Sequence, residues 1–193
     1  YQPFDPMKSV NWKAFARTGE LKVNLYEDTA SQEVCILLNL ENHGYVNHYD
    51  ILEENIRLAA TLSDMFIAKG IPVSLQTNGC DCTSGLPVCV DAGTGAGHQT
   101  RMLQSLARID LNTAPAHLSA QLHREISRGA NLPFVLLISN YCREDFMAAA
   151  EEIAKNSAGC QLIYTYHKDM LEDFKPSQQL YQKTFFWEVE HID

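Results

Sequence analysis

The sequence predicts an α/β fold with a mostly parallel central sheet and helices on both faces. Residues 34–38 and 134–139 are continuous apolar runs, and a polar residue follows each of them, Asn39 and Asn140. Apolar runs of this length are typical of parallel strands buried on both faces. In open α/β sheets the ligand crevice lies just beyond the carboxyl ends of such strands. We therefore expect Asn39 and Asn140 to lie near one another at that edge.

The composition is that of an ordinary globular domain. The chain has 193 residues, 46% hydrophobic and 20% charged, and a formal net charge of −9, which suits one domain with a sizeable core. Because phosphate binding requires clustered Lys and Arg, this charge argues against nonspecific binding to nucleic acid or to an anionic membrane.

The sequence shows no targeting or membrane-spanning segment. No apolar run reaches the roughly 18 residues of a membrane span, and the first residues lack the basic flank and apolar core of a signal peptide. Because the sequence does not begin with Met, we expect either a cytoplasmic protein or the soluble domain of a longer, membrane-anchored one.

The first part of the chain predicts an extended opening, a strand and a long helix. Pro3 and Pro6 favour extended backbone, and residues 21–25 alternate between apolar and polar as in a strand. From Asp50 onward, apolar residues recur at helical spacing until Gly70, which is a typical helix stop. The buried positions expected for this helix are Leu52, Ile56, Ala59, Leu62 and Phe66.

A strand pair is expected next. Residues 71–76 predict a strand in which Pro72 favours either an edge position or the strand start, and residues 86–90 predict a short strand that forms a hairpin with it. Gly93, Gly95 and Gly97 then precede a helix. They match no phosphate-binding motif, because no Gly-Lys-Ser/Thr follows, so we interpret them as a flexible loop.

The remaining residues predict helices alternating with strands. After the strand at 134–139, residues 143–155 predict a helix, residues 160–166 a strand, and the tail a short helical piece and a last strand at 184–189. In the helix after the three glycines, we expect Met102, Leu103, Leu106 and Ile109 to face the core. In the next helix, which Pro115 opens and Gly129 ends, we expect Leu118, Leu122 and Ile126 to do so. In the helix at 143–155, the residues expected to face the core are Phe146, Ala149, Ala150 and Ile153.

The six cysteines fall into different patterns. Cys35 and Cys160 lie in strand patterns, where Cys behaves as a small hydrophobe. Three others form a C-x-C-x6-C pattern: Cys80, Cys82 and Cys89. This spacing matches no common zinc motif, and His98 is the one candidate for a fourth ligand. We expect reduced thiols, as in cytosolic proteins generally.

The N-terminal residues resemble a bacterial family. The pattern Y-x-x-G-D…I-x-W-K-x-x-A-R-x-G-x-L of the domain-of-unknown-function 58 family is similar to residues 1–21, with Phe4 in place of the usual Gly. The residues that carry the resemblance are Tyr1, Asp5, Asn11, Trp12, Lys13, Ala16, Arg17, Thr18, Gly19 and Leu21. The resemblance implies a von Willebrand factor A-like domain, a three-layer Rossmann-like fold, at residues 29–193. Residues 1–28 would then be a family-signature segment that packs on this domain.

A divalent cation can sit at the top of the sheet in von Willebrand A-type domains. There it is bound by an Asp-x-Ser-x-Ser motif after the first strand, a later Thr and a later Asp. Asn39, Glu41 and His43 take the three motif positions here, and Asn140 takes that of the later Asp. Thr94 and Thr100 are both candidates for the Thr.

The aligned residues predict a degenerate metal-ion-dependent adhesion motif. Two neutral amides remove most of the attraction for a hard cation, so we expect no cofactor, with Mg²⁺ as the disfavoured alternative. Glu41 and His43 are the candidate ligands if a transition metal binds. The competing interpretation, which we favour, is that Asn39 and Asn140 tie loop backbone together.

The function expected is that of a protein-interaction or scaffold domain. The resemblance implies a MoxR-type AAA+ ATPase as the partner, because such proteins often accompany one another. One alternative is a metal-dependent ligand-binding site at the top of the sheet. The other is a thiol enzyme, with Cys142 as nucleophile, His43 or His48 as base and Glu41 as the group that orients the base. No catalytic motif supports the enzyme, so we expect none.

Overall fold

A seven-stranded sheet forms the centre of the computed structural model, which describes residues 33–42, 48–120, 122, 132–168, 170, 174 and 176–190. The strand order is β3-β2-β1-β5-β6-β7, and β4 pairs with β2. The strands are β1 (Val34–Leu38), β2 (Val73–Asp81), β3 (Pro87–Gly93), β4 (Ile109–Asp110), β5 (Leu132–Ser139), β6 (Ser157–Tyr166) and β7 (Thr184–Glu188). β1, β2, β5, β6 and β7 are parallel, whereas β3 and β4 run antiparallel to β2. The predicted α/β class with a mostly parallel sheet is therefore confirmed.

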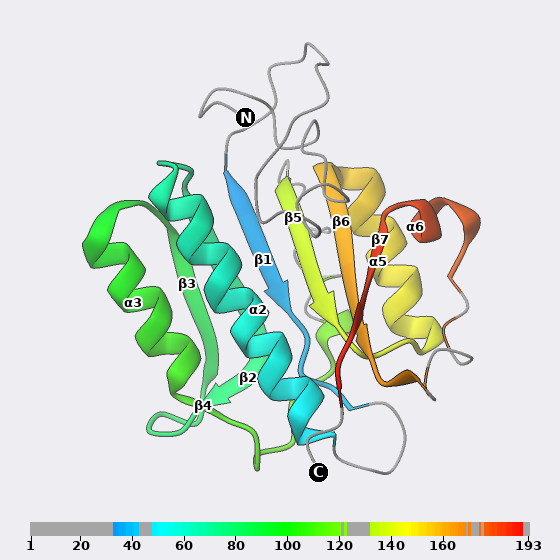
Figure 1. The fold of residues 1–193 in the computed structure, drawn as a ribbon, viewed down its shortest axis with the longest axis horizontal. Coiled ribbons are helices and arrows are strands. Elements are labelled where there is room, and N and C mark those ends of the chain that lie inside the picture. The colour runs from blue at the N-terminus through cyan, green and yellow to red at the C-terminus, as the bar shows by residue number, and fades with distance from the viewer. Residues whose placement is uncertain are drawn as a thin grey trace.

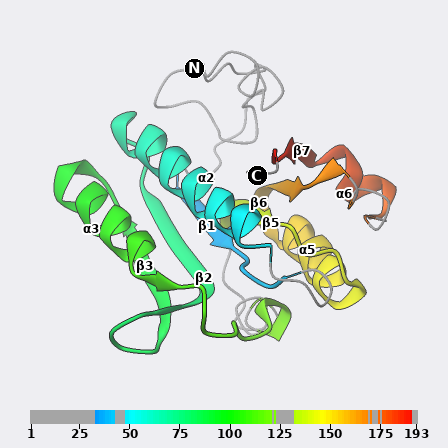
Figure 2. The ribbon, with the colours of Figure 1, turned by 60° about the horizontal axis from the view of Figure 1, so that its bottom comes forward.

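Helices cover both faces of the sheet. They are α2 (Tyr49–Ala68), α3 (Gly95–Ala107), α5 (Glu144–Asn156) and α6 (Gln178–Gln182). Figures 1 and 2 show α2 and α3 on one face and α5 on the other. This is the three-layer arrangement that right-handed strand–helix–strand crossovers produce.

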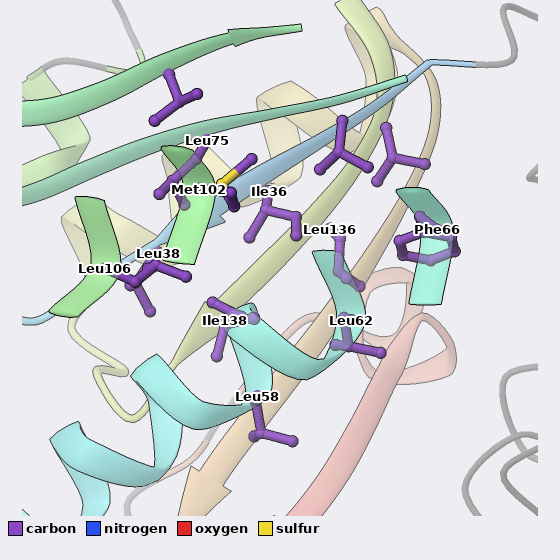
Figure 3. Close-up of a cluster of buried hydrophobic side chains, with 14 of the residues drawn as sticks. Ile36, Leu38, Leu58, Leu62, Phe66, Leu75, Met102, Leu106, Leu136 and Ile138 are labelled. Atoms are coloured by element: carbon purple, nitrogen blue, oxygen red, sulfur yellow. The ribbon is translucent and has the colours of Figure 1, made fainter. Parts of the chain in front are cut away.

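The alternation of side chains along β1 divides the core in two. Ile36 and its β1 neighbours on the same face pack with α2 and α3, and Figure 3 shows Ile36 and Leu38 among Leu62, Phe66 and Met102. The β1 residues between them, Cys35 and Leu37, pack with α5 instead. Because both faces of β1 are buried, every residue of this strand is apolar, as the sequence indicated.

The helix predicted to end at Gly70 is confirmed, and the residue has the left-handed φ of +74° that favours glycine. Pro72 comes directly before β2, which agrees with the predicted position at the start of a strand. The edge position is wrong, because β2 lies between β1 and β3. The hairpin is confirmed, since β3 pairs antiparallel with β2.

Two residues expected in the apolar stripe of α3 lie elsewhere. Ile109 belongs to β4, because α3 ends at Ala107, and Leu103 is 41% exposed. Met102 and Leu106 are buried as predicted. The glycines before this helix form no loop of their own, since β3 ends at Gly93 and α3 begins at Gly95.

The helix expected from Pro115 is described only at its start. Residues 118–120 and 122 are helical, and Leu118 and Leu122 are buried as predicted. Ile126 and Gly129 lie outside the described residues. The inward-facing residues predicted for α5 are all buried, as are Cys35 and Cys160.

Everything predicted for residues 1–32 lies outside the described residues, including Asp5, Trp12, Lys13, Arg17, Gly19 and the strand at 21–25. The proposed boundary at residue 28 therefore stays a prediction. Among the helices that the structure describes, none is long and apolar enough to cross a membrane.

Candidate functional site at the carboxyl edge of the sheet

Buried polar side chains collect where the parallel strands end. Asn39 follows β1, Asn78 lies near the end of β2, Asn140 follows β5 and Thr165 lies near the end of β6. All four side chains are almost fully buried, and Asn39 and Asn140 are 0% exposed. Buried polar groups are costly unless they are hydrogen-bonded, so their partners decide what this edge can do.

Asn39 links β1 to its two neighbouring strands. Its Nδ2 donates to Ser139 Oγ of β5 at 3.1 Å, and Ser139 Oγ in turn accepts from the Tyr141 backbone N–H. Its Oδ1 accepts from the Glu41 backbone N–H at 3.1 Å and from Asn78 Nδ2 at 2.8 Å. The amide of Asn39 thus ties loop backbone together, in the way that the sequence led us to favour.

The Asn78 side chain is the centre of this arrangement. Its Oδ1 accepts from the Leu40 backbone N–H at 2.9 Å, which fixes the orientation of the amide. Its Nδ2 then lies among three oxygens, 2.8 Å from Asn39 Oδ1, 2.9 Å from the Ala116 carbonyl and 3.5 Å from Glu41 Oε2. A donor group of the chain therefore stands where oxygen ligands converge.

Glu41 is a buried carboxylate whose two oxygens both accept hydrogen bonds. His117 Nδ1 donates to Oε1 at 2.8 Å, and the Leu118 backbone N–H donates to Oε2 at 3.0 Å. The side chain of His117 is itself 72% exposed. The contact therefore runs from a buried carboxylate to the surface, and the carboxylate positions the imidazole there.

A second buried network joins α2 to the ends of β5 and β6. Thr165 Oγ1 donates to Asn55 Oδ1 at 2.6 Å, and Asn55 Nδ2 donates to Asn140 Oδ1 at 3.4 Å. Within the described part of the chain, Asn140 Nδ2 has no hydrogen-bond partner. Asn39 and Asn140 thus lie at the same edge, as predicted, but in separate networks.

A cavity of about 590 Å³ opens beside Glu41. It lies between the loop after β1, the segment 110–117 and the loop after β5. The residues that line it are Leu40, Glu41, Asn42, Leu52, Gly79, Asp110, Leu111, Asn112, Thr113, Ala114, Pro115, His117, Tyr141 and Arg143. A cavity of this size with few convergent polar groups is typical of a binding site.

Tyr141 is the buried phenol of this cavity. Burial raises the pKa of Tyr141, the carboxylates of Glu41 and Asp145 raise it further, and Arg143 opposes them by charge and by a hydrogen bond. The phenol is therefore neutral near pH 7, and it can donate to a bound group.

The residues around Glu41 are a poor fit to Mg²⁺. A hard cation needs several oxygen lone pairs, preferably from carboxylates. Here neutral Asn39 and Asn140 take the positions of the two Asp residues of the motif. Both oxygens of Glu41 already accept hydrogen bonds, and Asn78 Nδ2 lies among the oxygens that remain. His43, the third motif position, lies outside the described residues.

The structure does not bring the candidate threonines to this edge. Thr94 follows β3, whose last residue Gly93 pairs with Val73 at the beginning of β2, so Thr94 lies at the opposite edge. Thr100 is exposed within α3 and donates to the Ala96 carbonyl at 3.0 Å.

Nor does it assemble the cysteines with His98. His98 Nε2 lies 2.8 Å from the Val73 carbonyl, at the amino-terminal edge of the sheet. Cys80 is seven residues further along β2, which corresponds to roughly 23 Å of strand. Cys82 and Cys89 are exposed, and no cysteine of the described residues is in a disulfide.

Cys142, the candidate nucleophile, follows β5 and is partly buried. It lines a shallow groove of about 850 Å³ with residues of α5, among them Glu144, Asp145 and Met147. Glu41, the candidate orienting group, already accepts hydrogen bonds on both carboxylate oxygens.

Asn78 and His117 are the residues of this edge that sequence reasoning missed. Asn78 lies within β2, which continues to Asp81 and alternates apolar with polar residues at its start, whereas the strand was predicted to stop at residue 76. His117 carries no local signal. Its pairing with Glu41 bridges 76 residues, so only the fold reveals it.

Comparisons with known proteins agree with this architecture. A family model described as "Protein of unknown function DUF58" matches residues 1–162. None of the curated proteins compared with the chain matches it significantly.

Two solved structures are similar in fold. One is a von Willebrand factor type A protein from Catenulispora acidiphila, with 12% identity and a TM-score of 0.51; the match covers 84% of this chain and 39% of that chain. The other is the crystal structure of the SpRpn10 VWA domain, with 10% identity and a TM-score of 0.45, covering 81% and 87% of the two chains. At 12% identity, the first likeness concerns the fold alone.

Proposed function

Because the chain belongs to the DUF58 family of proteins of unknown function and has a von Willebrand factor A-like fold, we propose that it is a protein-interaction domain that binds its partner at the carboxyl edge of the sheet. The observation that carries the proposal is the cavity of about 590 Å³ beside Glu41. Within its lining, Glu41 is buried and hydrogen-bonded, whereas His117 and Arg143, which we call its rim, are exposed.

The groups that would meet a partner are those of the rim. Asn39 and Asn140 are fully buried, so they shape the edge and cannot themselves contact another protein. The exposed His117 ring, held by Glu41, and the exposed Arg143 beside Tyr141 offer donors and positive charge. This rim suits an acidic or carbonyl-rich segment of a partner, because Arg and imidazole pair well with such oxygens.

The finer proposal is that the partner is a MoxR-type AAA+ ATPase. Its support is the family resemblance of residues 1–21, which is an analogy and not a contact. The test is copurification of the full chain with a MoxR-type ATPase, followed by a binding isotherm. Absence of association at micromolar concentration would contradict this partner.

A pair of matched variants tests the surface. Arg is enriched among the interface residues whose truncation costs more than about 1 kcal/mol, and we expect Arg143→Ala to weaken binding by about five-fold or more. Arg101→Ala removes an exposed Arg of α3, outside the cavity, and is expected to bind like the unaltered chain. Equal loss in both variants would place the contact elsewhere.

We propose further that binding at this edge needs no Mg²⁺. The support is the Asn78 amide nitrogen, which lies among oxygens that a cation would otherwise use. In calorimetric titrations with Mg²⁺ and Mn²⁺, we expect the unaltered chain to give no binding heat beyond that of the Glu41→Gln variant. A 1:1 isotherm lost in that variant would instead support the metal-dependent alternative.

A further inference from the structure

We propose that His48, Asp50 and His167 form a binding site for a divalent transition metal of the zinc class. The site is distinct from the cavity beside Glu41 and does not depend on the function proposed above. His48 is the residue before α2, Asp50 lies in its first turn, and His167 directly follows β6. One ligand atom from each residue lies within 4.8 Å of the others. Among the described residues, this is the one group of three or more His, Cys, Asp or Glu side chains with such proximity.

His167 is oriented as a metal ligand would be. It is 1% exposed, and its Nδ1 lies 2.8 Å from the Val189 carbonyl. Because a carbonyl only accepts, Nδ1 carries the proton and Nε2 is the nitrogen directed at Asp50. A backbone carbonyl on the far nitrogen is the usual outer-shell partner of a metal-binding histidine, since it fixes both tautomer and ring orientation.

Asp50 presents one oxygen to this nitrogen. Its Oδ2 lies 2.9 Å from His167 Nε2, while its Oδ1 accepts from the Ile51 backbone N–H at 3.0 Å. With metal–ligand bonds of about 2.1 Å, two neighbouring ligand atoms are separated by roughly 3.0 to 3.4 Å. The observed spacing is thus close to that of two ligands on one ion. Without metal, the same two groups form an ion pair when His167 is protonated.

His48 is the third proposed ligand and lies on the solvent-exposed side of the cluster. Its ring meets that of His167 edge-on, with centroids 5.7 Å apart, and it is partly exposed. Its ligand nitrogen lies within 4.8 Å of the other two ligand atoms, so the ring has to move toward them when the ion binds. Because the cluster is buried at His167 and open at His48, three protein ligands would leave a coordination position for water or an exogenous group.

The donor types select the class of metal. Two imidazoles and one carboxylate suit Zn²⁺ and its first-row neighbours, whereas Mg²⁺ and Ca²⁺ favour oxygen alone. The two candidate sites of this edge therefore differ in chemistry, since the surroundings of Glu41 offer chiefly amide and carboxylate oxygens whose lone pairs are already in use.

The test is calorimetric titration of the full chain with ZnCl₂. The exposed Cys82 and Cys89 also bind zinc readily, so all variants carry Cys82→Ser and Cys89→Ser. We expect one zinc per chain, with the dissociation constant raised at least about ten-fold by Asp50→Asn and by His48→Ala. Glu41→Gln, in the neighbouring cavity, is the control and is expected to bind as before.

A second readout identifies the ligands. In the same background, Co²⁺ is expected to give visible absorption without the thiolate charge-transfer band of cysteine ligation. His167→Ala removes a buried ring and is expected to destabilise the fold, so the decision rests on the other two variants, with folding checked by circular dichroism. No uptake of zinc would overturn the proposal. So would uptake that Asp50→Asn and His48→Ala leave unchanged, or that Glu41→Gln abolishes.

Discussion

The side chain of Asn78 joins three segments of the chain at the carboxyl edge. It bridges β2 to the loop after β1 through Leu40 and Asn39, and to the segment before Leu118 through the Ala116 carbonyl. A buried amide with both ends paired specifies one arrangement of its neighbours, because any displacement leaves polar groups unsatisfied.

Removal of this amide should therefore be costly. Asn78→Ala leaves the buried Leu40 N–H without its partner and removes one of the two donors to Asn39 Oδ1, and we expect a loss of about 2 to 4 kcal/mol in the free energy of unfolding. The measurement is urea denaturation followed by circular dichroism. Asn112→Ala, which removes an exposed amide bonded only within its own loop, is the control and should cost about 0.5 kcal/mol or less.

The variant Asn78→Asp tests whether the Asn78 amide nitrogen takes the place that a cation could occupy. Asn78→Asp keeps an oxygen for the Leu40 N–H but places a second carboxylate oxygen against Asn39 and Glu41. We expect Mg²⁺ to raise the Tm of this variant more than that of the unaltered chain, because the ion would offset the added negative charge and bind the folded state. Equal changes of Tm with Mg²⁺ in both proteins would contradict this expectation.

At the scale of elements, Asp81 joins the β2–β3 hairpin to the end of α3. Its carboxylate accepts from the Thr83 and Ser84 backbone N–H groups at 2.8 Å, and Arg108 Nε lies 2.8 Å from it. The hydrogen bonds from Ser84 and Thr83 lower the pKa of Asp81 most, and Arg108 adds to this. A carboxylate stabilised only in the folded state contributes stability above its unfolded pKa.

The pH dependence follows from that direction. The contribution of Asp81 is fully present above the ordinary pKa of 3.8 and is lost as pH falls through the lower, folded value. We therefore expect Asp81→Asn to be less stable than the unaltered chain at pH 6, with the difference shrinking below pH 3.8. Thermal unfolding at several pH values measures this, and a difference that grows on acidification would contradict it.

Prediction from sequence succeeded best for elements whose signal is local. The run at 34–38 and the helix ending at Gly70 were predicted correctly, because burial on both faces and helix stops leave marks in the sequence itself. Leu103 and Ile109 were misassigned, since apolar residues at helical spacing do not reveal where α3 ends. The Glu41–His117 pair and the cluster of His48, Asp50 and His167 join distant segments, so no local pattern predicts them.

At the scale of the whole molecule, the sheet separates two cores. Ile36 and Leu37 are neighbours in β1, yet they pack on opposite faces with different helices. In a sheet with one solvated face, only one of two such neighbours would be essential. The three-layer architecture instead makes both of them core residues.

Paired truncations test this architecture. Ile36→Ala and Leu37→Ala are each expected to lower the free energy of unfolding by about 2 to 5 kcal/mol, because each leaves a cavity in a packed core. Leu103→Ala, at an exposed position of α3, should cost less than about 1 kcal/mol. Urea denaturation provides the measurement, and a negligible cost at either β1 position would contradict burial on both faces.

The position of the Asn78 amide also bears on how an association at this edge would be controlled. An ion arrives after folding, exchanges with solution and can be removed by a chelator, so a site built on it follows the supply of metal. An amide is encoded in the chain and is in place once the chain has folded. If the edge held by Asn78 binds without Mg²⁺, as proposed, the association would persist when a chelator removes that ion.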